Sequence, residues 1–354
     1  MTSIETAPAG AGVSDMAALL PRIAEARTKA VNWLVDRIGD NGKPEGADER
    51  NSWWRAPWAL ATAGATDAAA AMIGWVEREA LTDEGDLRGG PIGGDAADTP
   101  VYQLSPIAIA AWMLARYDTA GTIMDGLEHW TDPVTGGVWE YKDHANNPVQ
   151  DTLKTCQLGI SSLVTGRTTV SDGVARWLRS AWDAQPELEA HRYYPSFSGG
   201  RAVTNFPEQE RLLRLVDFTQ PKQLYFHTGI AGAFLAGYSQ QTGDRSAIEL
   251  GAKFLDLNKQ GTERQYDDQT SVQICKFGWG VAWMNNAAPG SGNLPWVLRM
   301  GEWFVDRQRP DGAWAPSSFL APERQPDLFD LYWKTAEHLM ELAYIEQSLL
   351  ARRS

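Results

Sequence analysis

The chain has 354 residues, of which 43% are hydrophobic, so it can bury a large core. Its formal net charge of -13 argues against a nucleic-acid partner, because such a partner calls for a basic face. Two cysteines are no disulfide framework, and no apolar run reaches the roughly 18 residues of a membrane span. We therefore expect a cytoplasmic protein.

The first segment, residues 1–14, is small, polar and rich in Gly and Ala. It lacks the charged start and apolar run of a signal peptide, and we expect a flexible N-terminus. The sixteen tryptophans of the chain are unusual, since Trp is normally buried or stacked on a ligand.

Two kinds of helical segment alternate along the rest of the chain. The first is amphipathic and ends near an aromatic residue followed by a polar turn; the aromatics are Trp33, Trp75, Trp130, Trp177, Phe254 and Trp303. The second is rich in Ala, Gly, Leu and aromatics; its copies begin near Ser52, Val101, Asp151, Lys222, Ser271 and Asp327.

Two alternating helix types repeating at about 50 residues indicate a closed repeat architecture. Small-residue runs allow close packing of the second type inside, with the amphipathic type outside. The sequence therefore predicts an all-α fold, an (α/α)6 toroid of six helical hairpins, as one domain over residues 15–354. A longer interval holds an insertion at about 189–221, a candidate lid.

The turn Gln308-Arg309-Pro310-Asp311-Gly312-Ala313-Trp314 follows the aromatic segment Trp303–Val305. It resembles the QW repeat of squalene-hopene cyclases and of prenyltransferase β-subunits. This resemblance to the terpenoid cyclase/prenyltransferase-like toroid superfamily implies that Gln308 and Trp314 tie an outer helix to the next inner one. Residues 135–139 are a degenerate copy.

Several motifs of that superfamily are absent. The Asp-x-Asp-Asp of class II cyclases does not occur, and Asp267-Asp268 is the nearest pair. The zinc set of the prenyltransferases has no convincing match. A lanthipeptide-cyclase zinc site would need Cys156, Cys275 and His227 to converge, but their neighbours differ from that family. The same toroid also serves glycan epimerases and hydrolases, so the fold alone does not give the function.

Aligning the inner helices by their small residues places one polar position in each. That position holds Arg55, Gln103, Lys154, His227 (or Phe226), Lys276 and Lys334. Four cations at equivalent ring positions favour a pocket for a carboxylate, sulfate or phosphate. Internal pairing is the alternative, because Asp151 precedes Lys154 and Asp330 precedes Lys334 at helical ion-pair spacing.

Acid–base candidates lie at the starts of the same helices. His227 lies among aromatics and could titrate near neutrality. A carboxyl whose pKa is raised by an aromatic wall could protonate an alkene, an alcohol or a glycosidic oxygen. The candidate proton carriers are His227, Asp330, Asp151, Tyr102, Tyr225 and Glu337. Each has a structural alternative as a core residue or as the partner of a lysine.

Inner-helix tryptophans could be core residues, or could line a pocket that stabilises a carbocation or stacks on a sugar. We take Trp54, Trp58, Trp279 and Trp333, with the four cations, as candidate substrate-binding residues. No metal ligand set is expected and no cofactor is required, although Mg²⁺ could act on a diphosphate.

Three functions remain open from the sequence. The first is an acid–base enzyme acting on a hydrophobic, terpenoid-type small molecule as a cyclase, isomerase or lyase. The second is a glycan-active hydrolase, lyase or epimerase that binds an anionic sugar. The third is a non-catalytic helical scaffold, which the inward polar residues disfavour.

Overall fold

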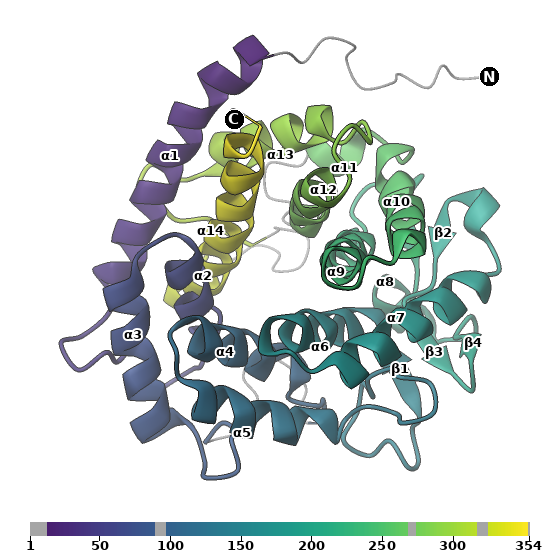
Figure 1. Cartoon of the computed structure of the whole chain (residues 1–354), viewed down its shortest axis with the longest axis horizontal. Helices are drawn as coiled ribbons and strands as arrows, with labels where there is room; N and C mark the ends of the chain where they lie inside the picture. The colour runs from purple at the N-terminus through teal and green to yellow at the C-terminus, as the bar shows by residue number, and fades with distance from the viewer. Residues whose placement is uncertain (1–12, 89–96, 268–273, 317–324, 353–354) are drawn as a thin grey trace.

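The computed structural model describes residues 13–88, 97–267, 274–316 and 325–352. Within these residues, six helices form an inner ring (Figure 1). They are α2 (Ala56–Thr62), α4 (Val101–Met113), α6 (Thr152–Thr165), α9 (Phe226–Thr242), α12 (Cys275–Ala287) and α14 (Leu328–Leu350). The outer ring is α1 (Val13–Val35), α3 (Thr66–Trp75), α5 (Tyr117–Glu128), α7 (Thr168–Asp183), α10 (Arg245–Lys259) and α13 (Leu294–Arg307).

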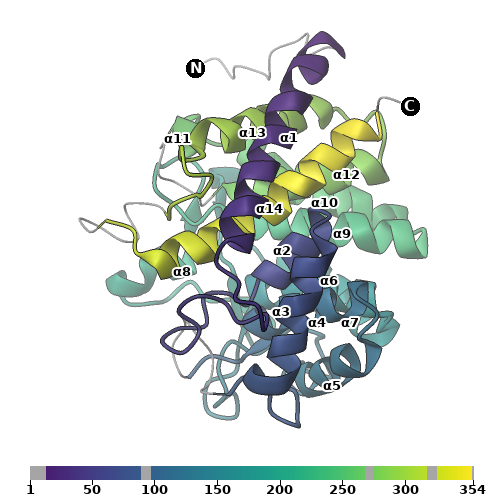
Figure 2. The same cartoon turned by 90° about the vertical axis from the view of Figure 1, so that its left-hand side faces the viewer.

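The inner helices contact one another in chain order, and the last one, α14, packs against the first one, α2. The outer helix α1 closes the second ring by packing on both α13 and α14, and Figure 2 shows it crossing α14. The predicted all-α toroid of six hairpins is therefore confirmed.

Glycine allows the closest inner-helix contact, between α9 and α12. A Cβ added to Gly229 would overlap the backbone of Lys276, and one added to Gly280 would overlap the carbonyl of Gly229. The small-residue runs of the sequence therefore set the spacing of the ring, as expected.

The turn after α13 joins three helices. Gln308 donates from Nε2 to the carbonyl of Ala26 in α1 at 2.8 Å and to that of Gly312 at 2.9 Å. Trp314 donates from its indole to the carbonyl of Phe304 at 2.9 Å. Its backbone N–H donates to the Thr335 hydroxyl in α14 at 3.1 Å. Trp314 therefore contacts both the outer helix α13 and the inner helix α14, whereas the Gln308 side chain bonds to the outer helix α1 instead of the inner helix that the resemblance implied.

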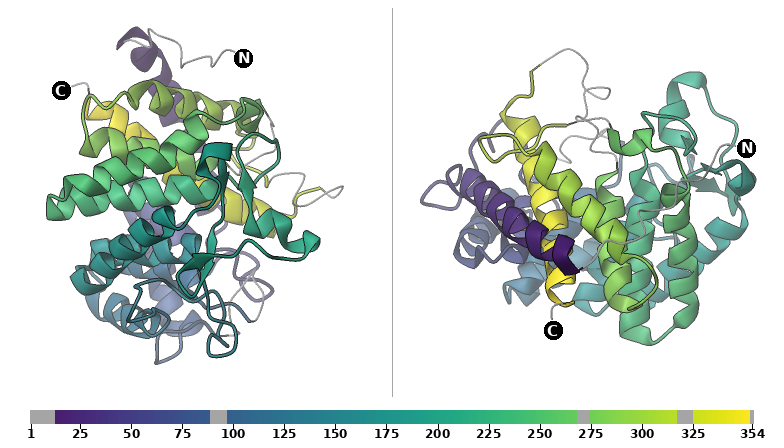
Figure 3. Two further views of the ribbon diagram at one scale, coloured as in Figure 1. Left: turned by 90° about the vertical axis from the view of Figure 1, so that its right-hand side faces the viewer. Right: turned by 90° about the horizontal axis from the view of Figure 1, so that it is seen from above.

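The segment predicted as an insertion, 189–221, forms short strands and helical turns. Strand β1 (Val149–Asp151) pairs antiparallel with β3 (Ser196–Ser198), β3 pairs with β4 (Arg201–Ala202), and β2 (Arg192–Tyr193) pairs with β5 (Val216–Asp217). The remaining pieces are α8 (Arg211–Arg214), α11 (Arg264–Asp267), a π-helical turn at Val76–Ala80 and 3₁₀ turns at Leu188–Ala190 and Glu208–Glu210. Because β1 leads directly into α6, these strands lie beside the start of an inner helix (Figure 3). Closure over a pocket stays a prediction.

The flexible N-terminus expected at residues 1–14 lies mostly outside the described residues, and α1 begins at Val13. Among the described helices, none combines the length and the apolar character needed to cross a bilayer.

Candidate active site

The starts of the inner helices are structurally equivalent. Thr155 in α6 and Thr335 in α14 both accept a backbone N–H from the preceding turn through their hydroxyls, at 2.9 and 3.1 Å. Lys154 and Lys334 each come one residue earlier, so they occupy the same position of two repeats. The alignment of polar ring positions made from the sequence is consistent with this geometry.

Three of the four predicted cations meet at one carboxylate, that of Glu337. Arg55 and Lys276 both contact Oε1 of Glu337, and Lys334 lies 2.7 Å from Oε2. All four side chains are at most 5% exposed. We call these four residues the charge cluster. One carboxylate faces three cations within the cluster, and Glu341, whose Oε1 lies 3.9 Å from the Lys276 ammonium, reduces the formal excess to one positive charge.

The ionisation of the charge cluster is maintained by its own pairing. Burial opposes the charged form of Glu337, but Lys276, Lys334 and Arg55 hold its pKa well below the usual range. Burial likewise acts against Lys276, and Glu337 and Tyr102 raise its pKa. The predicted ion pair of Lys334 with Asp330 is thus replaced, among described residues, by one with Glu337.

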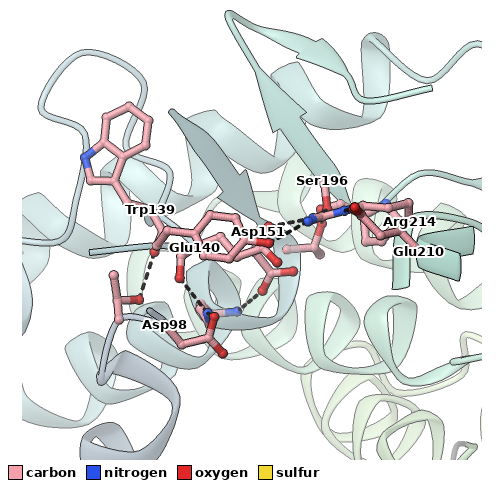
Figure 4. Close-up of polar contacts among 12 residues, drawn as sticks. Asp98, Trp139, Glu140, Asp151, Ser196, Glu210 and Arg214 are labelled. Atoms are coloured by element: carbon pink, nitrogen blue, oxygen red, sulfur yellow. Dashed lines mark hydrogen bonds and ion pairs between the residues drawn. The ribbon is translucent and has the colours of Figure 1, made fainter. Parts of the chain in front are cut away.

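Lys154, the fourth predicted cation, contacts a separate polar group that includes Asp98 and Glu140 (Figure 4). Its ammonium donates to the carbonyl of Glu140 at 2.7 Å and lies 3.3 Å from Asp98. Asp151 accepts the backbone N–H of Lys154 at 2.8 Å as the cap of α6, so it contacts the lysine backbone instead of pairing with its ammonium as predicted.

The carboxyls of this second group differ in environment. The Glu140 carboxylate pairs with Arg214, from the 189–221 segment, at 2.6 Å. Burial raises the pKa of Asp151 to about 6, and the nearby charge of Glu140 adds to the effect. Asp151 therefore titrates closer to neutrality than an ordinary aspartate, as an acid–base role would require.

A cavity of about 170 Å³ opens beside the charge cluster. Its lining mixes aromatic, charged and amide side chains: Arg50, Ser52, Trp54, Tyr102, Gln103, Phe329, Asp330 and Trp333. Four of these eight are sequence-predicted site residues, namely Trp54, Tyr102, Asp330 and Trp333.

The aromatic wall of this cavity covers the charge cluster directly. The guanidinium carbon of Arg55 lies 4.5 Å from the centroid of the Trp54 ring and 5.0 Å from that of Tyr102. The ammonium of Lys334 lies 3.9 Å from the centroid of the Trp333 ring. The aromatic rings that line the cavity are therefore also in contact with the buried cations of the charge cluster.

Two side chains of the lining can carry a proton, Asp330 and Tyr102. Asp330 lies in the first turn of α14, where it forms a capping box with Asp327: the Asp330 N–H donates to Asp327 at 2.9 Å and the Asp327 N–H to Asp330 at 3.2 Å. Tyr102 lies in the first turn of α4, with its ring 5.3 Å from that of Trp54. A carboxyl and a phenol facing one small cavity are suited to general acid–base chemistry.

Other predicted site residues are not part of this cavity's lining. Burial, with the charge of Lys276 nearby, lowers the pKa of His227 to about 3, so its imidazole is neutral at pH 7. The expectation that His227 titrates near neutrality is therefore wrong. The Tyr225 hydroxyl donates to the carbonyl of Gln220. Trp58 and Trp279 are buried with their ring centroids 5.6 Å apart and pack in the core of the ring.

The residues that the sequence offered as possible metal ligands do not come together in the part of the chain that the structure describes. The Asp267–Asp268 pair falls partly outside the described residues. Among described residues, the one group of Cys, His and acidic ligand atoms close enough to share a metal ion is Cys275, His338 and Glu341. The convergence considered for Cys156, Cys275 and His227 is not found there.

Sequence reasoning missed the cavity residues Arg50, Ser52 and Phe329. Arg50 and Ser52 precede α2, and Phe329 opens α14. Their signal in the sequence is adjacency to Trp54 and Asp330, which lie on the same rim.

Comparison by sequence identifies no relative: no family model matches the chain, and no curated protein sequence does. Comparison of structures does find similar folds. The GH76A α-1,6-mannanase from Salegentibacter sp. HEL1_6 is 11% identical, with a TM-score of 0.64 over 92% of this chain and 99% of that one.

Two further solved structures are enzymes of other classes. A D-mannose isomerase is 11% identical, with a TM-score of 0.64 over 98% of this chain and 99% of that one. A type II terpene cyclase from Scytonema is 13% identical, with a TM-score of 0.52 over 94% and 99%. The chain has an α/α toroid fold. At these identities the similarity establishes the fold alone, and the fold is one that glycan-active and terpenoid enzymes share.

Proposed function

We propose that the protein is an acid–base enzyme that acts on a small sugar acid or related anionic polyol in the cavity beside the charge cluster. The reaction class is proton transfer next to a carbonyl or carboxylate, as in an isomerase, epimerase or lyase. The observation that carries the proposal is the net positive charge directly behind the aromatic wall.

The size of the cavity supports a small ligand. At about 170 Å³ it is below the range of roughly 300–1,000 Å³ that holds drug-sized molecules. At about 30 Å³ for each water molecule, it corresponds to roughly six waters. A single sugar unit is closer to this scale than a long isoprenoid chain.

The sign of the charge supports an anionic ligand or intermediate over a carbocation. A ligand on the opposite face of the Trp333 ring would lie about 8 Å from the Lys334 ammonium. At that distance, and at an effective dielectric constant near 20, the electrostatic interaction between two unit charges is about 2 kcal/mol. One net charge thus favours an enolate or carboxylate by about 2 kcal/mol and disfavours a carbocation by the same amount.

The remaining lining residues supply the other parts of such a reaction. Trp54 and Trp333 offer ring faces to the apolar face of a sugar, and Arg50, Ser52 and Gln103 offer hydrogen-bonding groups to its hydroxyls. In this proposal Asp330 takes a proton from carbon and Tyr102, which lines the same cavity, returns one.

The binding experiment is isothermal titration of the protein with a hexuronate, with the matched neutral hexose, and with a prenyl alcohol and a prenyl diphosphate. We expect the hexuronate to bind and the hexose to bind at least about 10-fold more weakly. Binding of the neutral prenyl alcohol, without the hexuronate, would instead favour the terpenoid function, which the aromatic wall also fits.

A matched pair of lysine variants tests the role of the charge cluster. Lys334→Met removes a cation of the cluster, whereas Lys154→Met removes the cation at the equivalent position of another repeat, away from Glu337. We expect Lys334→Met to weaken hexuronate binding by about 10-fold and Lys154→Met to leave it within about 2-fold. Equal losses in both variants would contradict the assigned site.

Turnover is tested by hydrogen exchange on the ligand. The protein is incubated with the hexuronate in D₂O, and the loss of carbon-bound proton signals is followed by NMR. Asp330→Asn and Tyr102→Phe are expected to slow this exchange at least about 100-fold while helical circular dichroism is retained. Undiminished exchange in both variants would remove these residues from the mechanism.

A further inference from the structure

Three side chains next to the charge cluster, on α12 and α14, share a feature that the proposed function does not use. Cys275 is the first residue of α12, and His338 and Glu341 lie three residues apart on one face of α14. One ligand atom from each lies within 4.8 Å of the others. All three side chains are buried, with at most 1% of their surface exposed.

The polar atoms of this group are without hydrogen-bond partners. Neither ring nitrogen of His338 and neither carboxylate oxygen of Glu341 makes a hydrogen bond. His338 Nδ1 lies 3.3 Å from Glu341 Oε2 but outside hydrogen-bond geometry, and the Lys276 ammonium lies 3.9 Å from Glu341 Oε1. Four buried and unsatisfied donor or acceptor atoms at one point are costly unless a further group completes them.

The imidazole is held in place by an aromatic surround. The rings of Phe304, Trp314 and Trp303 lie 5.2, 5.8 and 6.1 Å from that of His338, centroid to centroid. These neighbours orient the ring but leave its nitrogens free.

We propose that Cys275, His338 and Glu341 bind one transition-metal ion of borderline softness, with Zn²⁺ as the first candidate. A thiolate, an imidazole and a carboxylate are a donor set that suits Zn²⁺ and does not suit Mg²⁺ or Ca²⁺, which take oxygen ligands. The His338–Glu341 separation of 3.3 Å matches the spacing of about 3.3–3.7 Å between ligands of a tetrahedral zinc site. This assignment departs from the expectation, made from the sequence, of no metal ligand set.

The charges balance when the ion binds. Cys275 releases its thiol proton to solvent as the Sγ–metal bond forms, so the thiolate and the Glu341 carboxylate together offset the two charges of the ion. His338 binds as the neutral imidazole. Three protein ligands leave the fourth tetrahedral position for water or another small ligand.

The experiment uses Co²⁺ as a spectroscopic substitute for Zn²⁺. The full chain is expressed in zinc-supplemented medium and its metal content is measured; it is then unfolded with chelator and refolded with Co²⁺. We expect about one ion for each chain, with a thiolate-to-Co²⁺ charge-transfer absorption and the visible bands of a tetrahedral site.

The two cysteines of the chain provide a matched pair of variants. Cys156 is also buried at the start of an inner helix, α6, but has no place in the cluster. Cys275→Ser is expected to abolish the charge-transfer band, and Cys156→Ser to retain it. The isosteric Glu341→Gln is expected to weaken Co²⁺ binding at least about 10-fold with circular dichroism unchanged, which separates ligand loss from misfolding.

The proposal is overturned if protein from zinc-rich medium holds no stoichiometric metal and refolding with Co²⁺ gives no charge-transfer band. It is also overturned if the band persists in Cys275→Ser. Neither readout involves a sugar acid or turnover, so its failure is distinct from failure of the proposed function.

Discussion

Replacing Glu337 by Gln tests the charge cluster most directly. The change keeps the shape of the side chain but removes the one negative charge that contacts Arg55, Lys276 and Lys334. The three buried cations would then keep only Glu341, 3.9 Å from the Lys276 ammonium, as a counter-charge, and their formal excess would rise from one to two. Breaking a buried ion pair by removing one partner costs about 3–5 kcal/mol.

This loss converts into a shift of the melting temperature. With an unfolding entropy of about 2.1 cal/mol/K for each residue, a chain of 354 residues has roughly 0.74 kcal/mol/K in total. A loss of about 4 kcal/mol therefore lowers Tm by about 5 °C. Differential scanning calorimetry at pH 7 in low salt is the assay, with circular dichroism to confirm the fold.

Glu346→Gln is the matched control on the same helix. Glu346 pairs at 2.6 Å with the single cation Arg27, whose side chain is 31% exposed. We expect a shift below about 2 °C for that variant, since partly exposed pairs contribute about 0–1 kcal/mol. Adding sulfate is expected to recover part of the stability of Glu337→Gln and not of Glu346→Gln, because the three cations can then bind the anion.

The pH dependence gives a second check on Glu337. Its pKa in the folded protein is held well below the ordinary value of 4.5, so its stabilising effect is fully present above about pH 4.5. The effect is lost as the pH falls toward the folded pKa, and the gap in Tm between wild type and Glu337→Gln should narrow there. A gap below about 1 °C at pH 7 would refute the inference that this carboxylate neutralises the cations.

Three other predictions concern stability, each read from Tm. Burial and Glu140 raise the pKa of Asp151 from 3.8 to about 6, so ionising this carboxyl costs folding free energy as the pH rises through that interval. Asp151→Asn keeps the helix cap and should stabilise the protein by about 1–3 kcal/mol at pH 8 but not at pH 3.5. An equal effect at both pH values would contradict the shifted pKa. Gly312 has φ +93°, and a Cβ there would lie 2.7 Å from a carbonyl oxygen of α1, whereas Gly290 has φ +87° and open space around it. Gly312→Ala should therefore lower the free energy of unfolding by well above the roughly 1–2 kcal/mol expected for Gly290→Ala. Similar losses of stability in the two variants would show that the close approach at Gly312 relaxes. Thr335→Val leaves the N–H of the turn after α13 without its hydroxyl acceptor and should cost about 1–3 kcal/mol, and an unchanged Tm would mean that this tie between the rings is dispensable.

The helix pattern and the ring could be predicted from the sequence. Periodic apolar residues specify each helix locally, and their repetition at about 50 residues leaves a closed ring as the arrangement that buries every apolar face. Equivalent repeats then put equivalent positions at the same height, which is why Lys154 and Lys334 could be aligned from the sequence.

The sequence could not determine which of those positions meet. Arg55, Lys276 and Lys334 converge because their helices α2, α12 and α14 are neighbours in the closed ring, with Glu337 on the middle one. Lys154 starts α6, which lies between α4 and α9 and does not neighbour α14, so its ammonium pairs locally with Asp98.

The sequence likewise could not show that Cys275, His338 and Glu341 come together. His338 and Glu341 are close in sequence, but Cys275 joins them only because α12 packs against α14. Spacing along one helix determines which residues share a face, and closure of the ring determines which faces come together. The sequence by itself therefore determined the toroid, while tertiary contact between neighbouring helices decided which charged and polar side chains come together.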